Sequence, residues 1–333
     1  MNLQKTSERP ARIGRKESQW EETIFDLSPV EEIEGIRFKR EDKYAPLGYG
    51  SINGSKLRQL IWLVHQYRMN GGAAGLLSGA SVKSPQLSMG TAVASHFGLP
   101  ATHVIGATNP VSSMQHSDVE IATMLGATFE YSKVAYNGAL QSMVNRLLQT
   151  PKYAGYFHLE YGVSLDHKKH DPAKLEAFHR VGAEQVRNIP ECDTLIIPSG
   201  SCNSLTSILY GLSIFKPKVK KLVLVEIGPS RRDWVAERLA MIQSTLKALP
   251  YDVTGAAEDY EITYHDLHGS KYVSYQETMK YQLGDITFHP RYEGKVMTYL
   301  SDRCPELLNS DNVVWIIGGE SKVERIKEVI ASG

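Results

Sequence analysis

The stretch Gly48-Tyr-Gly-Ser-Ile-Asn-Gly-Ser-Lys-Leu-Arg-Gln-Leu60 joins a glycine-rich bend to the start of a predicted helix. Residues 38–42 come before it and have a strand-like pattern. Apolar side chains follow the bend at helical spacing, at Leu57, Leu60, Ile61, Val64 and Tyr67. Asn53 or Ser55 can cap this helix, and Gly71-Gly72 can end it. The bend therefore marks a strand-to-helix connection, which in α/β proteins is a common place for a binding site.

Lys56 falls in the first turn of this predicted helix. The positive end of the helix dipole disfavours a second positive charge there. The same field lowers the pKa of the amine, and a less protonated amine is a better nucleophile. A lysine held in this way suits Schiff-base chemistry with an aldehyde cofactor. The alternative for a lone lysine is a solvated side chain at a helix end, so the neighbouring residues decide.

The neighbours of Lys56 carry a resemblance to a known family. Lys39-Arg-Glu-Asp42, a glycine-rich gap and Asn53-Gly-Ser-Lys-x-Arg-x-Leu60 resemble the cofactor-lysine segment of fold-type II pyridoxal-phosphate (PLP) enzymes. The sequence is most similar to the branch of 1-aminocyclopropane-1-carboxylate deaminase and D-cysteine desulfhydrase. The resemblance implies that Lys56 forms a Schiff base with PLP and that Asn53 belongs to the cofactor-binding residues.

A second candidate segment, Ser199-Gly-Ser-Cys-Asn-Ser-Leu-Thr206, joins a predicted buried strand at 194–198 to a predicted helix at 205–215. Backbone N–H groups of such a turn, together with a helix N-terminus, form a cradle for anions. The alternative is an ordinary polar turn. The segment resembles the family's phosphate loop, Gly-Ser-Gly-Gly-Thr, but Cys and Asn replace two glycines, and Cys adopts a left-handed conformation poorly. The predicted phosphate contacts are Gly200, Ser201, Cys202, Asn203 and Ser204.

The third segment, residues 78–90, again lies between a predicted strand and a predicted helix. Its Ser84-Pro-Gln86 is similar to the family's Ser-Asn-His/Gln triplet, which holds the substrate carboxylate and supports the cofactor ring. The resemblance implies that Ser81, Ser84 and Gln86 bind the substrate. Pro85 departs from the pattern, because proline has no backbone N–H and no polar side chain. A plain helix cap by Ser84 is an equal alternative.

Three further segments complete the resemblance. His289-Pro-Arg-Tyr-Glu-Gly-Lys-Val-Met297 is similar to the family's Asp-Pro-Val-Tyr-Thr-Gly-Lys-Ala-Met, which implies that Tyr292 lines the active site. Gly269-Ser-Lys-Tyr272 is similar to a Gly-x-x-Tyr segment that supplies another active-site tyrosine, and a tyrosine there can move a proton. Residues 313–320 resemble the terminal strand, where Ile317 replaces the threonine that faces the pyridine nitrogen. This replacement predicts a weaker electron sink.

Composition excludes several classes of protein. The chain has 333 residues, of which 42% are hydrophobic, so it can form a large core. A formal net charge of zero argues against binding to nucleic acid or membranes by bulk electrostatics, although an amino-acid-modified larger substrate stays open. Cys192, Cys202 and Cys304 show no paired spacing. With no apolar run of membrane-spanning length and no signal-peptide core, we expect a cytoplasmic protein.

Two weaker signals are set aside. Residues 48–53 nearly match a dinucleotide fingerprint but lack its third glycine and a clear acidic partner, so NAD binding is not expected. The histidines near the middle of the chain do not have the spacing of a metal site, and we predict a solvated charged loop without metal. These histidines are His158, His167, His170 and His179.

The alternation of strand and helix patterns predicts an α/β protein with two largely parallel twisted sheets flanked by helices. We expect a loosely ordered tail at 1–20, a small inserted domain at 74–165, and a large PLP-binding domain formed by 21–73 and 166–333. The family implies a homodimer that performs β-elimination or deamination of an amino acid or an amino-acid conjugate. β-Replacement is one alternative. The other is a protein of the same fold that binds PLP or an amino acid with altered or lost activity.

Overall fold

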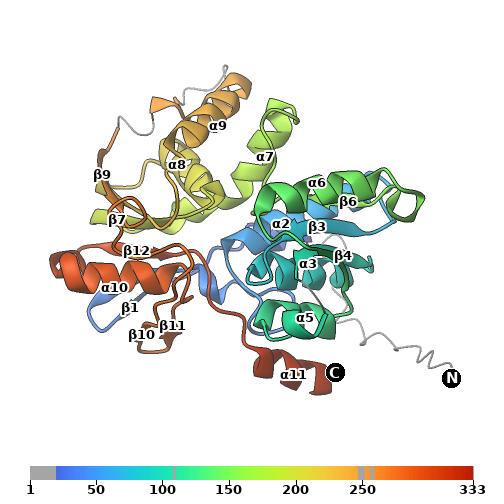
Figure 1. Cartoon of the computed structure of the whole chain (residues 1–333). Coiled ribbons are helices and arrows are strands. Elements are labelled where there is room, and N and C mark those ends of the chain that lie inside the picture. The colour runs from blue at the N-terminus through green and yellow to red at the C-terminus, as the bar shows by residue number, and fades with distance from the viewer. Residues whose placement is uncertain (1–19, 108–109, 247–251, 256–258, 333) are drawn as a thin grey trace.

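The computed structural model describes residues 20–107, 110–246, 252–255 and 259–332. Most of the predicted N-terminal tail lies outside these residues. Two sheets with helices on both faces account for the described chain (Figure 1). The six-stranded sheet has the order β1 (Val30–Ile33), β2 (Ile36–Arg40), β12 (Val313–Ile316), β7 (Cys192–Ser199), β8 (Val219–Glu226) and β9 (Glu261–Asp266). The four-stranded sheet has the order β5 (Thr128–Ser132), β4 (Ala101–Gly106), β3 (Leu76–Ala80) and β6 (Phe157–Leu159).

Parallel pairing dominates both sheets. In the six-stranded sheet only β1 and β2 pair antiparallel, and every pair in the four-stranded sheet is parallel. Strand β7 carries the run Leu195-Ile-Ile197, in which all three side chains are fully buried. A continuous apolar run of this kind is typical of a parallel strand that is covered on both faces. The predicted fold class is thus confirmed.

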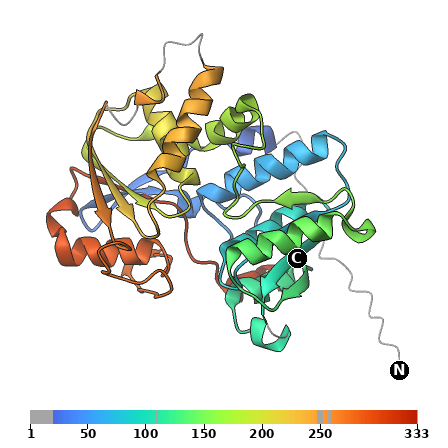
Figure 2. The same cartoon turned by 45° about the horizontal axis from the view of Figure 1, so that its top comes forward.

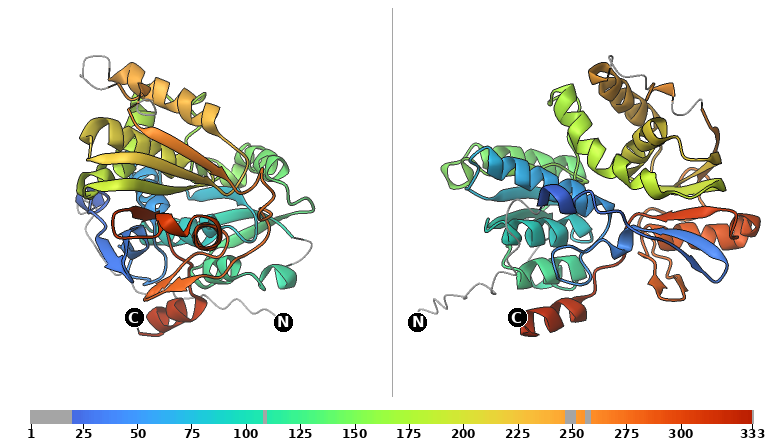
Figure 3. Two further views of the ribbon diagram at one scale, coloured as in Figure 1. Left: turned by 90° about the vertical axis from the view of Figure 1, so that its left-hand side faces the viewer. Right: turned by 180° about the vertical axis from the view of Figure 1, so that it is seen from behind.

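Helices cover the six-stranded sheet on both faces. On one face lie α7 (Pro172–Ala183), α8 (Asn203–Phe215) and α9 (Arg232–Thr245). On the other lies α10 (Glu293–Arg303), whose Val296, Met297 and Leu300 pack against Phe38 and Ile196 of the sheet (Figure 3). Carboxyl ends of parallel strands meet at one edge of a sheet, so the loops after β7, β8 and β12 are brought together there.

The four-stranded sheet is covered in the same way. Helices α3 (Pro85–His96) and α5 (Ser117–Met124) pack on one face, and α6 (Asn137–Leu148) packs on the other. Helix α11 (Val323–Ser332) lies beside α5 at the end of the chain, and Lys327 Nζ is 3.1 Å from Glu120 Oε1 (Figure 1). All four strands fall inside the predicted insertion at 74–165. The division into domains at these boundaries stays a prediction.

The remaining described elements are short. They are α1 (Trp20–Thr23), α4 (Pro110–Ser113), β10 (Gln282–Leu283), β11 (Ile286–Thr287) and the 3-10 turns at Glu41–Lys43, Pro151–Tyr153, Glu184–Asn188 and Pro305–Leu307. Among all the residues that the structure describes, no helix has the length and apolar character that a membrane crossing requires.

Helix α2 (Ser55–Met69) lies between the two sets of helices and contacts α3, α7 and α8 (Figure 2). Most residues of its first half are buried, including the charged Arg58. The Arg58 guanidinium meets Glu41 at 3.0 Å, and neither side chain is exposed. Ser28 donates a further hydrogen bond to Glu41 at 2.8 Å. Because a buried charge without a partner is very costly, this pair ties α2 to the chain that leads into it.

The N-caps predicted for α2, Asn53 or Ser55, are wrong, whereas the glycines predicted to end the helix do follow it. Gly54 is the N-cap, with φ +104°, and no side chain caps the helix. A side chain at position 54 would place its Cβ 2.8 Å from the carbonyl oxygen of Ile317, so glycine is needed for this close approach. At the other end Asn70 is the C-cap and Gly71 follows with φ +80°.

The solvated loop predicted around the central histidines is also wrong in part. His167 and His179 are buried. His179 Nδ1 lies 2.9 Å from Ser207 Oγ, and its Nε2 accepts a hydrogen bond from Arg238 at 2.9 Å. His167 Nε2 lies 2.8 Å from Glu237. The His179 ring therefore belongs to a buried polar network between α7, α8 and α9, whereas the His167 ring joins the segment before α7 to a half-exposed carboxylate of α9.

Candidate active site

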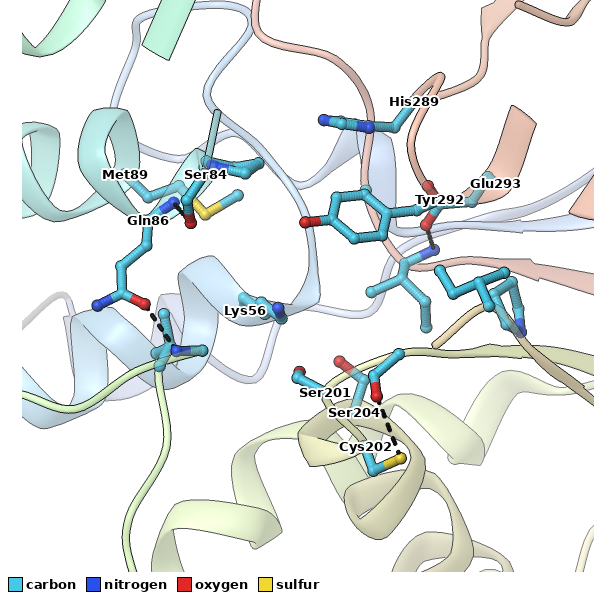
Figure 4. Close-up of a pocket in the computed structure, with 18 of the residues that line it drawn as sticks. Lys56, Ser84, Gln86, Met89, Ser201, Cys202, Ser204, His289, Tyr292 and Glu293 are labelled. Carbon is cyan, nitrogen blue, oxygen red and sulfur yellow. Dashed lines mark hydrogen bonds between the residues drawn. The ribbon is translucent and has the colours of Figure 1, made fainter. Parts of the chain in front are cut away.

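A cavity of about 100 Å³ opens where the loops after β3, β7, β8 and β12 meet the start of α2. Figure 4 shows Lys56 between two groups of side chains, with Ser84, Gln86 and Met89 on one side and Tyr292 and Glu293 on the other. Ser201, Cys202 and Ser204 lie below it. The other lining residues are Pro85, Gly162, Val163, Pro198, Gly200, Leu205, Ile227, His289, Ile317, Gly318 and Gly319.

Lys56 is held in the cavity by the residues just before it. The backbone N–H of Ser55 donates to the carbonyl of Ile317 at 2.8 Å, and Ser55 Oγ lies 2.8 Å from Ser204 Oγ. Burial lowers the pKa of the Lys56 amine from its usual value, and the charge of Arg231 lowers it further, whereas Glu293 and Cys202 raise it. Removal of the amine from water is thus the main cause of its lowered pKa, whereas the sequence pointed to the helix dipole. The predicted direction, toward a more nucleophilic amine, agrees.

The predicted phosphate loop lies at the N-terminus of α8. Cys202 is the N-cap and takes the left-handed conformation, with φ +67°, that the family's glycine would take more easily. No backbone acceptor in the described chain receives the N–H groups of Ser201, Asn203 or Ser204. Unpaired N–H groups at the start of a 13-residue helix fit an anionic phosphate well.

Two of the predicted cofactor residues do not line the cavity and instead hold its walls. Asn203 donates to the carbonyls of Gly162 and Val163 at 3.0 and 3.3 Å. Asn53 accepts from the backbone N–H of Gly319 at 2.7 Å and donates to the Ser51 carbonyl at 3.0 Å. Both asparagines therefore position lining segments.

The predicted substrate turn at the start of α3 is partly in the cavity. Ser84, Pro85 and Gln86 line it, but Ser81 does not. Ser84 Oγ caps the helix by accepting from the Gln86 N–H at 3.3 Å. The Gln86 side chain accepts from the Gly162 N–H at 2.7 Å and donates to the Glu160 carbonyl at 3.2 Å. Gln86 thus fastens α3 to the 160–162 segment.

Of the two predicted tyrosines, the structure brings only Tyr292 to the cavity. Burial raises the pKa of its hydroxyl, so the group stays a proton donor near neutral pH. Tyr272 lies elsewhere, where its hydroxyl donates to Asp302 at 2.6 Å and its ring meets that of Tyr299 edge-on. The Gly-x-x-Tyr pattern thus belongs to a tyrosine that packs beside α10 and not to one that lines the cavity.

Glu293, the one acidic residue among the described residues that line the cavity, was not predicted from the sequence. Its Oε1 accepts from the backbone N–H of Ile317 at 3.2 Å, and its Oε2 is buried without a partner among the described residues. Burial raises the pKa of this carboxyl to about 7, although backbone N–H groups lower it. A signal for this residue was present in the sequence, because Glu293 directly follows Tyr292 in the motif at residues 289–297.

His289, in the same motif, also lines the cavity. Burial lowers its pKa to about 3, with smaller contributions from the charges of Arg291 and Lys56. The ring is therefore neutral at physiological pH. With the ring neutral, the charge of the lining depends on Lys56, whose pKa burial lowers, and on Glu293, whose pKa burial raises to about 7.

Known proteins resemble this chain in sequence and in fold. No family model matches the chain. A protein of Salmonella phage ViI, named O-seryl-dTMP PLP-dependent decarboxylase, is 37% identical over 369 aligned positions, which cover 95% of this chain and 87% of that protein. Among solved structures, an ACC deaminase homologue aligns with a TM-score of 0.66 at 16% identity, covering 92% of this chain and 94% of the other. A threonine deaminase of Solanum lycopersicum aligns with a TM-score of 0.56 at 13% identity, covering 97% and 95%.

The fold and the buried lysine define a PLP enzyme of fold type II. This chain belongs to that family, and PLP is its cofactor. The cavity fits the group, because it offers a buried amine, unpaired N–H groups at a helix start, and an orphaned carboxyl oxygen.

Substitutions at Gly200 test the phosphate loop. A Cβ at this position would lie 3.5 Å from Ile227 Cδ1, an ordinary contact, so Gly200→Ala is the matched control and we expect it to bind PLP nearly as well as wild type. Gly200→Asp adds a negative charge beside a dianion and should weaken PLP binding by about tenfold or more. Equilibrium titration with PLP measures both. Equal affinities for the two variants would place the phosphate elsewhere.

The raised pKa of Glu293 predicts a pH-dependent stability of the cofactor-free protein. A carboxyl whose pKa rises from 4.5 in the unfolded chain to about 7 in the folded chain stabilises the protein below about pH 4.5. That contribution, about 3 kcal/mol at most, is lost as the pH rises through 7. Glu293→Gln cannot titrate, so its stability in urea should decline less over this window. Exposed Glu306→Gln serves as the control, and equal slopes for Glu293→Gln and wild type would contradict the assignment.

Proposed function

We propose that this enzyme removes the carboxyl group of a serine that is joined through its side-chain oxygen to a nucleotide. The similarity to the Salmonella phage ViI enzyme, whose name gives O-seryl-dTMP as the substrate and decarboxylation as the reaction, supports the substrate class. In this reaction the bond between the α-carbon and the carboxyl carbon breaks, CO₂ leaves, and the electron pair on the α-carbon takes up one proton. The product is an aminoethyl ether of the same nucleotide.

Three groups of the chain would hold the cofactor. Lys56 Nζ would bond the aldehyde carbon, the Gly200–Ser204 loop would bind the phosphate, and Glu293 would be the partner of the ring nitrogen, since its carboxyl lies beside Ile317. When bound, PLP supplies a sink for the electron pair that remains when a bond at the α-carbon breaks. With Glu293 in this role, the weak electron sink inferred from Ile317 is no longer needed.

The turn at the start of α3 is the observation that favours decarboxylation. Pro85 has no N–H, the Gln86 N–H is taken by Ser84 Oγ, and the Leu87 N–H donates to the Ser84 carbonyl at 3.1 Å. This helix end therefore has no free backbone donor from these positions for a substrate carboxylate. Donors to a carboxylate stabilise its charge, which is lost as CO₂ leaves, so they would stabilise the ground state more than the transition state. Their absence favours release of CO₂.

Two groups that line the cavity would move the proton and orient the substrate. The Lys56 amine, once the substrate amine has taken its place, would return a proton to the α-carbon. Tyr292, kept protonated by burial, would orient the substrate through its hydroxyl. The apolar side chains of Met89, Val163 and Leu205 would exclude water from the same space.

β-Elimination, the reaction predicted from the sequence, would break the bond between the β-carbon and the ether oxygen of the same substrate. It would release the hydroxyl-bearing nucleotide, a keto acid and ammonia. β-Replacement would release the same nucleotide without ammonia. The products therefore separate these reactions without ambiguity, whichever residue moves the proton. The homodimer stays a prediction.

The test is incubation of the PLP-loaded enzyme with O-seryl-thymidine monophosphate, followed by mass spectrometry of the nucleotide and assay of CO₂ and ammonia. We expect CO₂ and the aminoethyl ether in equal amounts. Pro85→Ala restores an N–H at the start of α3 and should lower the rate of decarboxylation by about three- to tenfold. Pro172→Ala is the control, because Pro172 takes the same first position in α7 and does not line the cavity. Ammonia with free nucleotide, and no CO₂, would contradict the proposal.

A further inference from the structure

A second cavity, of about 410 Å³, lies beside the first. Its walls come from α6, from the chain around β6 and the 160–169 segment, and from α9. The two cavities share the 160–166 segment, because Gly162 and Val163 line the first while Tyr161 and Ser164 line the second. A substrate whose amino-acid part fills the first cavity would therefore have its remaining part next to the second.

The second cavity has an excess of positive charge. Four cationic side chains and two carboxylates line it, counting histidine as neutral. Both carboxylates are engaged, since Asp166 pairs with Lys169 at 3.1 Å and Glu160 accepts a hydrogen bond from the Asp166 N–H at 2.7 Å. Lys168 and Arg231 are exposed and have no ion pair among the residues that the structure describes. They are the groups available for an anion.

Buried polar atoms in the same wall lack partners. Within the described chain, no hydrogen bond is made by His158 Nε2, His167 Nδ1 or Arg238 Nε, and all three residues line the cavity. His167 is 7% exposed and Arg238 is fully buried. These three atoms are buried behind the cavity surface, so they make the wall polar without themselves reaching a ligand in the cavity.

Trp234 gives this polar cavity an aromatic surface. The Arg238 guanidinium lies 3.7 Å from the centre of the indole ring, and the His167 ring meets the indole edge-on at 6.4 Å. Both contacts keep the indole in place. Arg231 also lies over the indole, with its guanidinium 5.9 Å from the ring centre. An ordered aromatic ring beside a positively charged groove is the combination that binds the bases and the backbone of a nucleic acid.

We propose that this second cavity binds the nucleotide part of the substrate, with Lys168 and Arg231 on the phosphate and Trp234 beside the base. The inference rests on the proposed function for the choice of a nucleotide. A phosphate monoester carries close to two negative charges at neutral pH, which matches the excess of positive charge in the lining. A local patch of this size is compatible with a net charge of zero for the whole chain.

The test is direct binding of thymidine monophosphate and of thymidine to the PLP-loaded enzyme by calorimetry. PLP already fills the phosphate loop, so that loop does not compete for the nucleotide. We expect thymidine monophosphate to bind about tenfold more tightly than thymidine, the effect of one or two hydrogen bonds between charged groups. Lys168→Ala and Arg231→Gln should each remove much of this difference and leave the affinity for thymidine unchanged.

Lys220→Ala is the control, because Lys220 is an exposed lysine at the other end of β8, where it pairs with Asp193. Equal binding of the two ligands, or wild-type affinity for thymidine monophosphate in both cavity variants, would overturn the proposal. This outcome is separate from the product assay, since neither ligand carries a serine. A short oligothymidylate distinguishes the two sources of the phosphate: tighter binding than the mononucleotide indicates a polymeric substrate, and weaker binding indicates a free nucleotide.

Discussion

The close approach of Gly54 to the end of β12 is the constraint on which the rest of the site depends. No side chain fits at position 54 against the Ile317 carbonyl, and the next residue, Ser55, donates its N–H to that same carbonyl. The Ser55 hydroxyl reaches Ser204, so the start of α2, the end of β12 and the start of α8 meet at one point. Lys56 follows directly, so one backbone hydrogen bond and one contact between hydroxyls set its position relative to the start of α8.

Charge within the cavity depends on the same packing. Lys56 and Glu293 are both removed from water, and burial shifts the pKa of each toward its neutral form. Because the pKa of Glu293 is about 7 and the pKa of Lys56 is lowered, both groups exchange protons with a substrate at a smaller energetic cost than in water. Farther out, Arg231 lines the second cavity and also lowers the pKa of Lys56. An anion bound near Arg231 would offset that positive charge and thus raise the pKa of Lys56.

Patterns within one segment were readable from the sequence, whereas contacts between distant segments were not. The helix after Lys56 and the buried strand at β7 follow from spacing and apolar runs, and the turn at residues 200–204 follows from its place between strand and helix. The N-cap of α2 could not be predicted, because Gly54 is required by the Ile317 carbonyl, which lies just after β12. Tyr272 was wrongly assigned to the site, because a Gly-x-x-Tyr pattern does not reveal that the hydroxyl donates to Asp302. Glu293 was missed because only the fold turns it toward Ile317.

The most direct measurement of the central claim is the site at which PLP attaches. The protein is incubated with PLP, its visible spectrum is recorded, and borohydride reduction is followed by peptide mass spectrometry. We predict a visible band that Lys56→Ala abolishes without loss of the fold, and a reduced adduct on Lys56 alone. Lys83→Ala, a lysine near the α3 turn that does not line the cavity, should keep the band. An adduct on another lysine, or an unchanged band in Lys56→Ala, would contradict the account.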